Sequence, residues 1–311
     1  MVMIGRFAVL LLVGAAWAQQ SHPVSGQRIF ATPQEAAEAL VNAASANDAA
    51  TLRALYGPAG QEIIESGDPA QDEARRQRFA MKAKESMRVA EDPFEPGRWI
   101  ISVGKDNWPL PIPIVKVKGG YRFDIQAAKG EILARRVGAN ELDAIALLRA
   151  LADAEVEFAY SDVDGNGMRD YAQKILSTPG KRDGLYWPAK EGAGECPLNK
   201  AAGDDIFAGD QLPASGQPLT FRGYVFRVLT AQGPNASGGA RDYVVRGDMI
   251  GGFAFIAYPA EYGVSGIKTF VVNQDGVVLE KDLGANTKTI AGAIKRYNPD
   301  KTWTESPRLA E

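Results

Sequence analysis

The sequence has very little histidine and cysteine: His22 and Cys196 are the one residue of each kind among 311. A Ser-His-Asp or Cys-His catalytic site needs a histidine base beside its nucleophile, and His22 lies in the N-terminal leader. A zinc site of the histidine–cysteine type is excluded for the same reason. One cysteine cannot form a disulfide within the chain, so Cys196 is interpreted as an incidental loop cysteine. A reactive thiol or a bond between two chains is the alternative.

An excess of positive charge is also missing. The chain has 35 Lys and Arg against 38 Asp and Glu, for a net charge of -3 and a pI near 5.5. A dedicated nucleic-acid-binding protein usually carries a basic face, so no nucleic-acid partner is expected. The sequence has no P-loop, no dinucleotide-binding glycine fingerprint and no Gly-x-Ser-x-Gly elbow. Hydrolysis by a pair of carboxylates stays open, because such a site needs only two acidic residues.

The first 18 residues have the pattern of a cleavable export signal. Arg6 precedes an apolar run from Phe7 to Val13, and Ala16-Trp17-Ala18 fits the small-x-small cleavage pattern. We therefore predict a signal peptide over 1–18 and a flexible leader over 19–30, with the protein placed in a bacterial periplasm or secreted. An uncleaved N-terminal anchor is the alternative. No second long apolar run follows, so no membrane span is expected after cleavage.

Residues 31–126 are predicted to form an N-terminal α+β domain, with helices first and a short antiparallel sheet after them. Capping and stop residues mark the helix ends, namely Thr32 with Glu35, Asp48, Gly57, and Asp68 with Pro69. The strand candidates are 98–103, 112–117 and 121–124, the last of them entered through Gly119-Gly120. This element order and the hairpin VKVKGGYRFD resemble the cone-shaped cystatin-like and nuclear-transport-factor-like folds, which implies a fold and no function.

Residues 127–311 are predicted to form a long helix followed by an antiparallel β domain of pilin-head type. Gly138 is expected to break a first helical segment, and Asn140 to cap a long helix that runs to about Tyr160. The apolar residues of this helix fall on two arcs, which predicts burial on two sides. One arc holds Leu142, Ile145, Leu148, Ala152, Val156 and Ala159, and the other holds Leu147, Leu151 and Phe158. A one-sided helix with a few exposed leucines is the alternative.

The β domain begins near Pro218. Its strand candidates are 221–229, 241–246, 253–258, 268–272 and 277–281, and a last helix is expected over 287–297. Residues 273–276 are predicted to form a hairpin turn, with Gly276 at the position that needs a positive φ.

The segment after the long helix carries the one motif that points to an ion. Oxygen side chains at loop positions one, three, five and nine, with a glycine at position six, are typical of the calcium loop of EF-hand type. The predicted ligands are Asp162, Asp164, Asn166, Asp170 and, by its backbone carbonyl, Met168. Position twelve should be a bidentate glutamate, but here it is Gln173. The alternative to a Ca²⁺ site is a turn whose side chains bind their own backbone.

Several segments have unusual composition: GKDNWPLPIP (104–113), ARRVGANEL (134–142), DGLYWP (183–188), GGFAFIAYP (251–259) and YGVSG (262–266). In this order they resemble the bacterial exported family called domain of unknown function 2950, over nearly the whole mature chain. The resemblance implies an exported protein, and it implies neither an activity nor catalytic residues.

A second resemblance covers about 140–284. It rests on the helix ending AEVEFAY, the DVDGNG loop, Gly223-Tyr224-x-Phe226, a Tyr-Gly-x-x-Gly stretch and the FVVNQDG hairpin. These features are similar to the soluble heads of type IV pilin-like and pseudopilin proteins. Pilins begin with a membrane helix at the point where this chain has an N-terminal domain, so the resemblance does not imply a filament.

Together these observations predict a non-enzymatic structural or interaction protein of the bacterial envelope, stabilised by Ca²⁺, with an envelope protein of unknown identity as its partner. The first alternative is a pseudopilin-like accessory of a secretion or pilus system. The second is a carboxylate-dependent carbohydrate-active hydrolase, for which Trp99, Trp108, Trp187 and Trp303 are candidate sugar-contacting residues.

Overall fold

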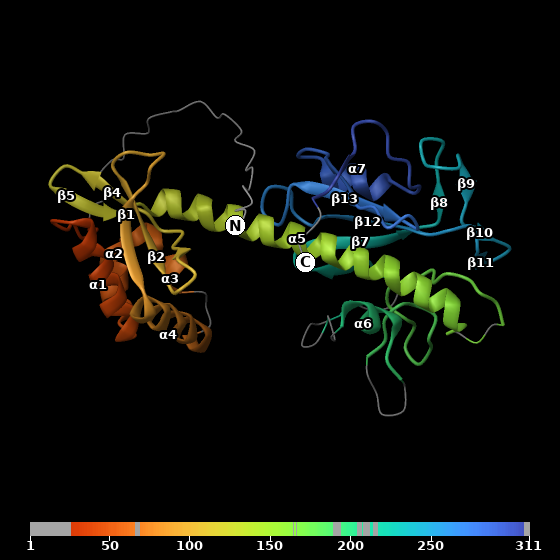
Figure 1. Ribbon diagram of the computed structural model, residues 1–311, viewed down its shortest axis with the longest axis horizontal. Coiled ribbons are helices and arrows are strands. Elements are labelled where there is room, and N and C mark those ends of the chain that lie inside the picture. The colour runs from red at the N-terminus through yellow and green to blue at the C-terminus, as the bar shows by residue number, and fades with distance from the viewer. Residues whose placement is uncertain are drawn as a thin grey trace, which may run out of the picture. The chain divides into compact units, whose positions relative to one another are not determined.

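The computed structural model describes residues 26–65, 69–163, 165, 167–188, 194–203, 207, 212–213 and 217–307. Within them the chain is α+β, as predicted, and its sheets are antiparallel (Figure 1). Its contacts divide into two compact units, the first ending at Lys129 and the second beginning at Gly130. The predicted signal peptide, 1–18, lies outside the described residues. Among the helices that are described, none combines the length and apolarity that a membrane span requires.

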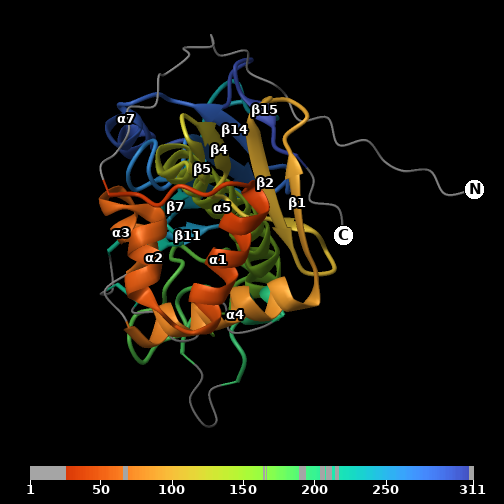
Figure 2. The same ribbon diagram turned by 90° about the vertical axis from the view of Figure 1, so that its left-hand side faces the viewer.

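The first unit begins with helices whose ends match the predicted caps at Thr32, Asp48 and Gly57, whereas the predicted cap Asp68 lies outside the described residues. They are α1 (Pro33–Ser45), α2 (Ala49–Tyr56), η1 (Pro58–Gly60), α3 (Gln61–Ile64) and α4 (Pro69–Glu85). Thr32 Oγ1 accepts the Glu35 amide at 3.1 Å, and Asp48 accepts the Thr51 amide at 2.9 Å. Gly57 ends α2 with a φ of 69°, where a side chain would be strained. Helix α1 packs against α2 and α4 (Figure 2).

The sheet of the first unit has the strand order β1-β2-β4-β5, and β3 pairs with β2. Its strands are β1 (Met87–Glu91), β2 (Arg98–Val103), β3 (Trp108–Pro109), β4 (Ile114–Val117) and β5 (Gly120–Phe123). Strands β2, β4 and β5 confirm the predicted strand positions to within two residues. Strand β1 was not predicted, because Met-Arg-Val-Ala-Glu carries little β-branched or aromatic character. Ile101, Ile114 and Phe123 are fully buried and form a core with Leu55 of α2.

Residues 19–30 were predicted to be a flexible leader, and this prediction is wrong for residues 27–30, which the structure describes. Phe30 exchanges two backbone hydrogen bonds with Tyr121 of β5, at 2.8 and 2.9 Å. The Gln27 amide donates to the carbonyls of Leu55 and Phe123. The free edge of β5 presents unpaired backbone groups, and residues 27–30 satisfy some of them. These residues therefore belong to the first unit.

Helix α5 (Ile125–Ser161) is continuous for 37 residues, so the predicted break at Gly138 is wrong. A single glycine inside a helix costs only about 1 kcal/mol relative to alanine, which tertiary packing readily offsets. Asn140 is not a helix cap either, because its side-chain amide donates to the Ser265 carbonyl at 2.8 Å. Beside it, Glu141 accepts the backbone amides of Ile267 and Lys268 at 2.9 and 3.0 Å. These bonds anchor this turn of α5 to the loop before a strand of the second unit.

The part of α5 in the second unit is buried on one broad face rather than on two. Leu142 and Val156, which the sequence placed on a buried arc, are 47% and 58% exposed. Ile145, Leu148 and Ala152 of the same arc are buried, and so are Leu147, Leu151 and Phe158 of the other arc. The two predicted arcs are therefore parts of one broad buried face, which also holds Ala144, Ala150 and Ala154. The one-sided alternative is therefore the correct one for this helix.

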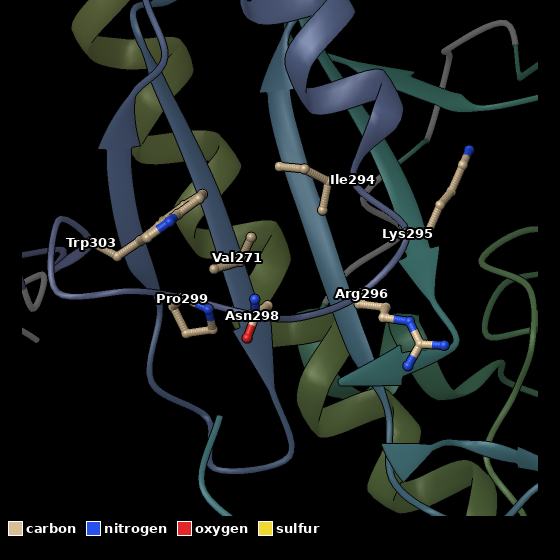
Figure 3. A pocket seen from close by; sticks show the side chains of 7 residues that line it. All are labelled: Val271, Ile294, Lys295, Arg296, Asn298, Pro299 and Trp303. Atoms are coloured by element: carbon tan, nitrogen blue, oxygen red, sulfur yellow. The ribbon is translucent and has the colours of Figure 1, made fainter. Parts of the chain in front are cut away.

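The second unit is built on an antiparallel sheet with the strand order β15-β14-β13-β12-β7-β6. Its strands are β6 (Leu219–Phe221), β7 (Tyr224–Leu229), β12 (Ala254–Pro259), β13 (Lys268–Asn273), β14 (Leu279–Asp282) and β15 (Thr304–Glu305). All six residues of β12 are buried, because both faces of this central strand are covered. In Figure 3, α5 runs behind the sheet and α7 (Thr287–Ala293) lies in front of it.

Shorter elements complete the second unit. They are α6 (Pro197–Ala202), β8 (Ala231–Gln232), β9 (Arg241–Asp242), β10 (Val244–Val245) and β11 (Asp248–Met249). The predicted strand over 221–229 is divided, because Arg222 and Gly223 have φ values of 46° and 76° and form a two-residue turn between β6 and β7. The predicted turn at 273–276 is confirmed, with the Gly276 amide donating to the Asn273 carbonyl at 2.9 Å.

We predict that Gly138→Ala raises the free energy of unfolding by about 0.5–1 kcal/mol, because Gly138 is a helix-interior residue with open space at its Cβ position. Gly239→Ala is the matched control. It also has open space, but its φ of 75° makes alanine unfavourable, so stability should fall. Urea denaturation measures both changes, and a loss of stability in both variants would contradict a continuous α5.

Candidate functional site

The predicted calcium loop begins where α5 ends. Asp162 has a φ of 43°, which stops the helix, and its side-chain Oδ1 accepts the backbone amide of Gly167 at 3.3 Å. Gly167 is loop position six and has a φ of 80°, so the sharp bend expected at this glycine is present. The loop therefore folds back onto its first residue. Asp164 and Asn166, at positions three and five, lie outside the described residues.

The end of the loop is anchored to the core. Asp170 at position nine is 6% exposed, whereas Met168 at position seven is 41% exposed. The next residue, Tyr171, donates its backbone amide to the Met249 carbonyl of β11 at 2.9 Å. Among the described residues, which leave out Asp164, no three His, Cys, Asp or Glu side chains gather as a metal site would require. The structure thus brings Asp162 and Asp170 to the two ends of one short loop.

The Gln173 side chain at position twelve is bonded outside the loop. The Gln173 side-chain amide donates to the Gly247 carbonyl at 2.6 Å, on the turn between β10 and β11. This hydrogen bond directs the amide group to the turn between β10 and β11, whereas an EF-hand loop has a glutamate at this position.

A buried glutamate that the sequence analysis missed lies beside the loop exit. Glu155 of α5 is fully buried, and its Oε2 accepts the backbone amide of Ala172 at 2.7 Å. Its Oε1 has no hydrogen-bond partner within the described part of the chain. Burial raises the pKa of Glu155 well above its ordinary value. The Ala172 amide opposes this shift, and the negative charge of Asp170 adds to it.

The position of Glu155 on the helix was readable in principle. It follows Leu151 by four residues and precedes Phe158 by three, which places it on the buried face of α5. The sequence analysis placed Leu151 and Phe158 on a buried arc, but it did not consider Glu155 between them, because most glutamates lie on the surface.

A surface pocket of about 350 Å³ lies beside β13 (Figure 3). Its lining residues are Val271, Ile294, Lys295, Arg296, Asn298, Pro299 and Trp303. The Asn298 side chain lies near the centre of the view, close to Val271, while the Lys295 and Arg296 side chains extend away from it. No carboxylate is among the seven residues, so this pocket does not provide the acid pair that glycoside hydrolysis needs.

The four tryptophans that the sequence analysis considered for a sugar cleft do not gather at this pocket. Trp303 lines it, and the Lys281 ammonium lies 5.9 Å from the centre of its ring. Trp187 is 9% exposed and belongs to the core of the second unit. Trp99 and Trp108 belong to the sheet of the first unit, and Trp99 contacts Tyr121 edge to face.

Asp183 is an acidic residue with a structural role in the second unit. Burial raises its pKa. Stronger opposing effects come from hydrogen bonds donated by the Lys174 ammonium and by the Thr178 amide and hydroxyl, so its pKa falls from 3.8 to about 2. These bonds connect residues 174–178 to the chain around 183–186. Because the folded pKa is depressed, this contribution to stability is complete above pH 3.8 and is lost as the pH falls toward about 2.

We predict that Asp183→Asn destabilises the protein at neutral pH. The difference from the wild type should shrink as the pH falls from 3.8 to about 2, because protonation of Asp183 weakens the same interactions. Asp143→Asn, on the exposed side of α5, changes the same charge and should leave stability nearly unchanged. Urea denaturation at a series of pH values measures this, and a pH-independent difference would contradict the assignment.

Comparison with known proteins supports the resemblance that runs over nearly the whole mature chain, and it supports neither of the other two. Searches of curated proteins and of solved structures find no match. The pilin-like resemblance and the specific cone-like and pilin-head fold types are therefore not confirmed. A family model described as "Protein of unknown function (DUF2950)" matches residues 27–306, which is most of the chain. The protein is a member of this family.

Proposed function

We propose that this protein is a non-enzymatic structural or interaction module of the bacterial envelope, stabilised by one Ca²⁺ ion at the loop 162–170. The proposal of a calcium site is supported by the hydrogen bond that closes the loop on Asp162 and by the burial of Asp170 at the other end of the loop. Calcium prefers six to eight hard oxygen ligands, and residues spaced along a tight loop bring their oxygens to one point. Millimolar calcium outside the cell can fill even a weak site of this kind.

The position of the loop indicates what a bound ion would do. The loop connects the last turn of α5 to the segment that pairs with β11, through Tyr171 and Met249. An ion held by the two ends of the loop would keep this connection closed when the rest of the unit fluctuates. A structural role fits this place better than a catalytic one, because the loop joins core elements.

Separate observations support the proposal that the protein is not an enzyme. Cys196, the one thiol of the chain, is 1% exposed, so it does not present a nucleophile at the surface. The pocket at Trp303 lacks a carboxylate among its lining residues. Reproducible turnover of a cell-wall or plant polysaccharide by the purified protein would contradict this part of the proposal. The envelope location rests on the pattern of residues 1–18.

We predict that calcium stabilises the EDTA-stripped mature protein. A ligand that binds only the folded state adds roughly 2.7 kcal/mol at about 100 times its Kd. This would raise Tm by about 5–10 °C for a unit of this size. Asp162→Ala and Asp164→Ala should abolish both the rise in Tm and the heat of calcium binding.

Asp143→Ala is the matched control, since it removes the same side chain from an exposed position on α5 and should keep the full calcium response. Circular dichroism confirms that each variant is folded before titration. A wild-type protein without heat of binding and without a Tm shift at millimolar calcium would identify the loop as a turn that binds only its own backbone.

A further inference from the structure

The pocket beside β13 has the size and composition of a small-molecule binding site. Its volume of about 350 Å³ lies within the range of about 300–1,000 Å³ that is typical of ligand pockets. Apolar walls come from Val271, Ile294 and Pro299, and Trp303 supplies an aromatic ring. Such sites orient a ligand through a few polar groups placed among apolar ones, and here one of these groups is Asn298.

The Asn298 side chain is held in place by the loop at 233–235. Its Oδ1 accepts the backbone amide of Asn235 at 2.9 Å. Its Cγ lies against the backbone of Gly233, where an added Cβ would come within 2.4 Å of that atom. Since Oδ1 is occupied, the Nδ2 group is left to donate, and it has no acceptor within the described part of the chain. The pocket therefore offers a positioned hydrogen-bond donor beside Val271 (Figure 3).

Trp303 gives the pocket the other feature that a sugar site needs. Its ring is partly exposed, whereas Trp187 is buried in the core. A partly exposed indole presents a flat apolar surface and an N–H donor at its edge. The CH groups on one face of a sugar ring pack on such a surface, while the hydroxyls of the sugar bind polar groups around it. Trp303 and Asn298 together therefore match a sugar ring.

The side of the pocket opposite Trp303 is positively charged. Lys295 and Arg296 are exposed there, and their side chains extend away from the centre of the pocket (Figure 3). The Lys295 ammonium donates to the Gly292 carbonyl at 3.4 Å, and it has no acidic partner among the described residues. Arg296 pairs with Asp242 at 3.4 Å, but an exposed pair of this kind is weak, so a carboxylate of a ligand can compete for the guanidinium. A ligand that reaches from the ring to these cations is elongated and carries negative charge.

We propose that this pocket binds an acidic oligosaccharide that contains uronic acid. One sugar ring packs on Trp303, a hydroxyl accepts the Asn298 Nδ2 group, and a carboxylate pairs with Lys295 and Arg296. None of the seven lining residues is acidic, so the bound carboxylate meets no like charge in the pocket, and no acid pair is present to cleave the sugar. This inference rests on the interaction role proposed above and gives it a ligand class, but it does not depend on the calcium loop.

The test titrates the EDTA-stripped mature protein with trimers of galacturonic, mannuronic and guluronic acid, followed by calorimetry. The galactose trimer of the same linkage is the neutral control ligand, and a glutamate tripeptide is the acidic control ligand without a sugar. We expect at least one uronic acid trimer to bind, less tightly as NaCl is raised, and both control ligands to bind at least about tenfold more weakly. In NMR spectra the indole N–H signal of Trp303, assigned with Trp303→Phe, should shift with the same trimer.

Two variants test the residues of the pocket. Asn298→Asp keeps an oxygen for the Asn235 amide but replaces the donor with a charged acceptor, so affinity should fall about tenfold or more. Lys295→Gln removes an exposed charge and should lower affinity about threefold to fivefold. Lys288→Gln, at an exposed position of α7, is the matched control and should bind as the wild type does. Circular dichroism confirms that each variant is folded, and the exposed Lys295 keeps the test valid if Asn298→Asp does not fold.

The inference is overturned if no uronic acid trimer binds, or if a trimer binds both Asn298→Asp and Lys295→Gln as tightly as the wild type. It is also overturned if the galactose trimer or the glutamate tripeptide binds as tightly as the uronic acid trimers, because the ligand would then not need a carboxylate or a sugar. The titrations contain no calcium, so their failure is distinguishable from failure of the calcium site. A rise in Tm with calcium but no sugar binding would leave the loop site standing, and sugar binding without that rise would leave the pocket assignment standing.

Discussion

The buried face of α5 is the constraint on which the second unit depends. Leu147, Leu148 and Leu151 are fully buried in the core that also contains the central strands β7, β12 and β13. A helix packed in this way cannot rotate about its own axis, because rotation would expose its leucines and bury its polar residues. That rotation also carries Glu155 into the interior and places Asp162 at the start of the loop. The chemistry of the loop is therefore set by the packing of the helix.

Local signals in the sequence predicted much of the fold. Thr32, Asp48 and Gly57 mark helix ends because each acts on backbone groups within one turn of its own position. The structure confirms all three helix ends. Gly138 misled the prediction for the opposite reason. A glycine in a helix is a small local cost, and the packing of α5 over many residues decides the outcome. The turn at Arg222 was missed because arginine is rarely found at a positive φ.

The candidate site also has one part that local sequence signals predicted and one part that they did not. The loop was found from spacing alone, because oxygen side chains at alternate positions around a glycine are a local pattern. Glu155 was not found, although it lies only seven residues before Asp162. Its importance comes from burial and from the amide of Ala172, and both depend on how the chain after the loop returns to α5. The helical spacing from Leu151 and Phe158 indicates that Glu155 is buried, but the contact with Ala172 cannot be predicted from the sequence around either residue.

The burial of Cys196 has a practical consequence. It is the residue just before α6, its thiol is the only one in the chain, and it belongs to the core cluster that includes Leu147 and Leu151. A thiol reagent in solution can modify it only when that core opens. The native protein thus carries an internal probe for opening of its second unit. The rate of labelling in calcium and in EDTA would report on local opening, with no engineered cysteine and no added dye.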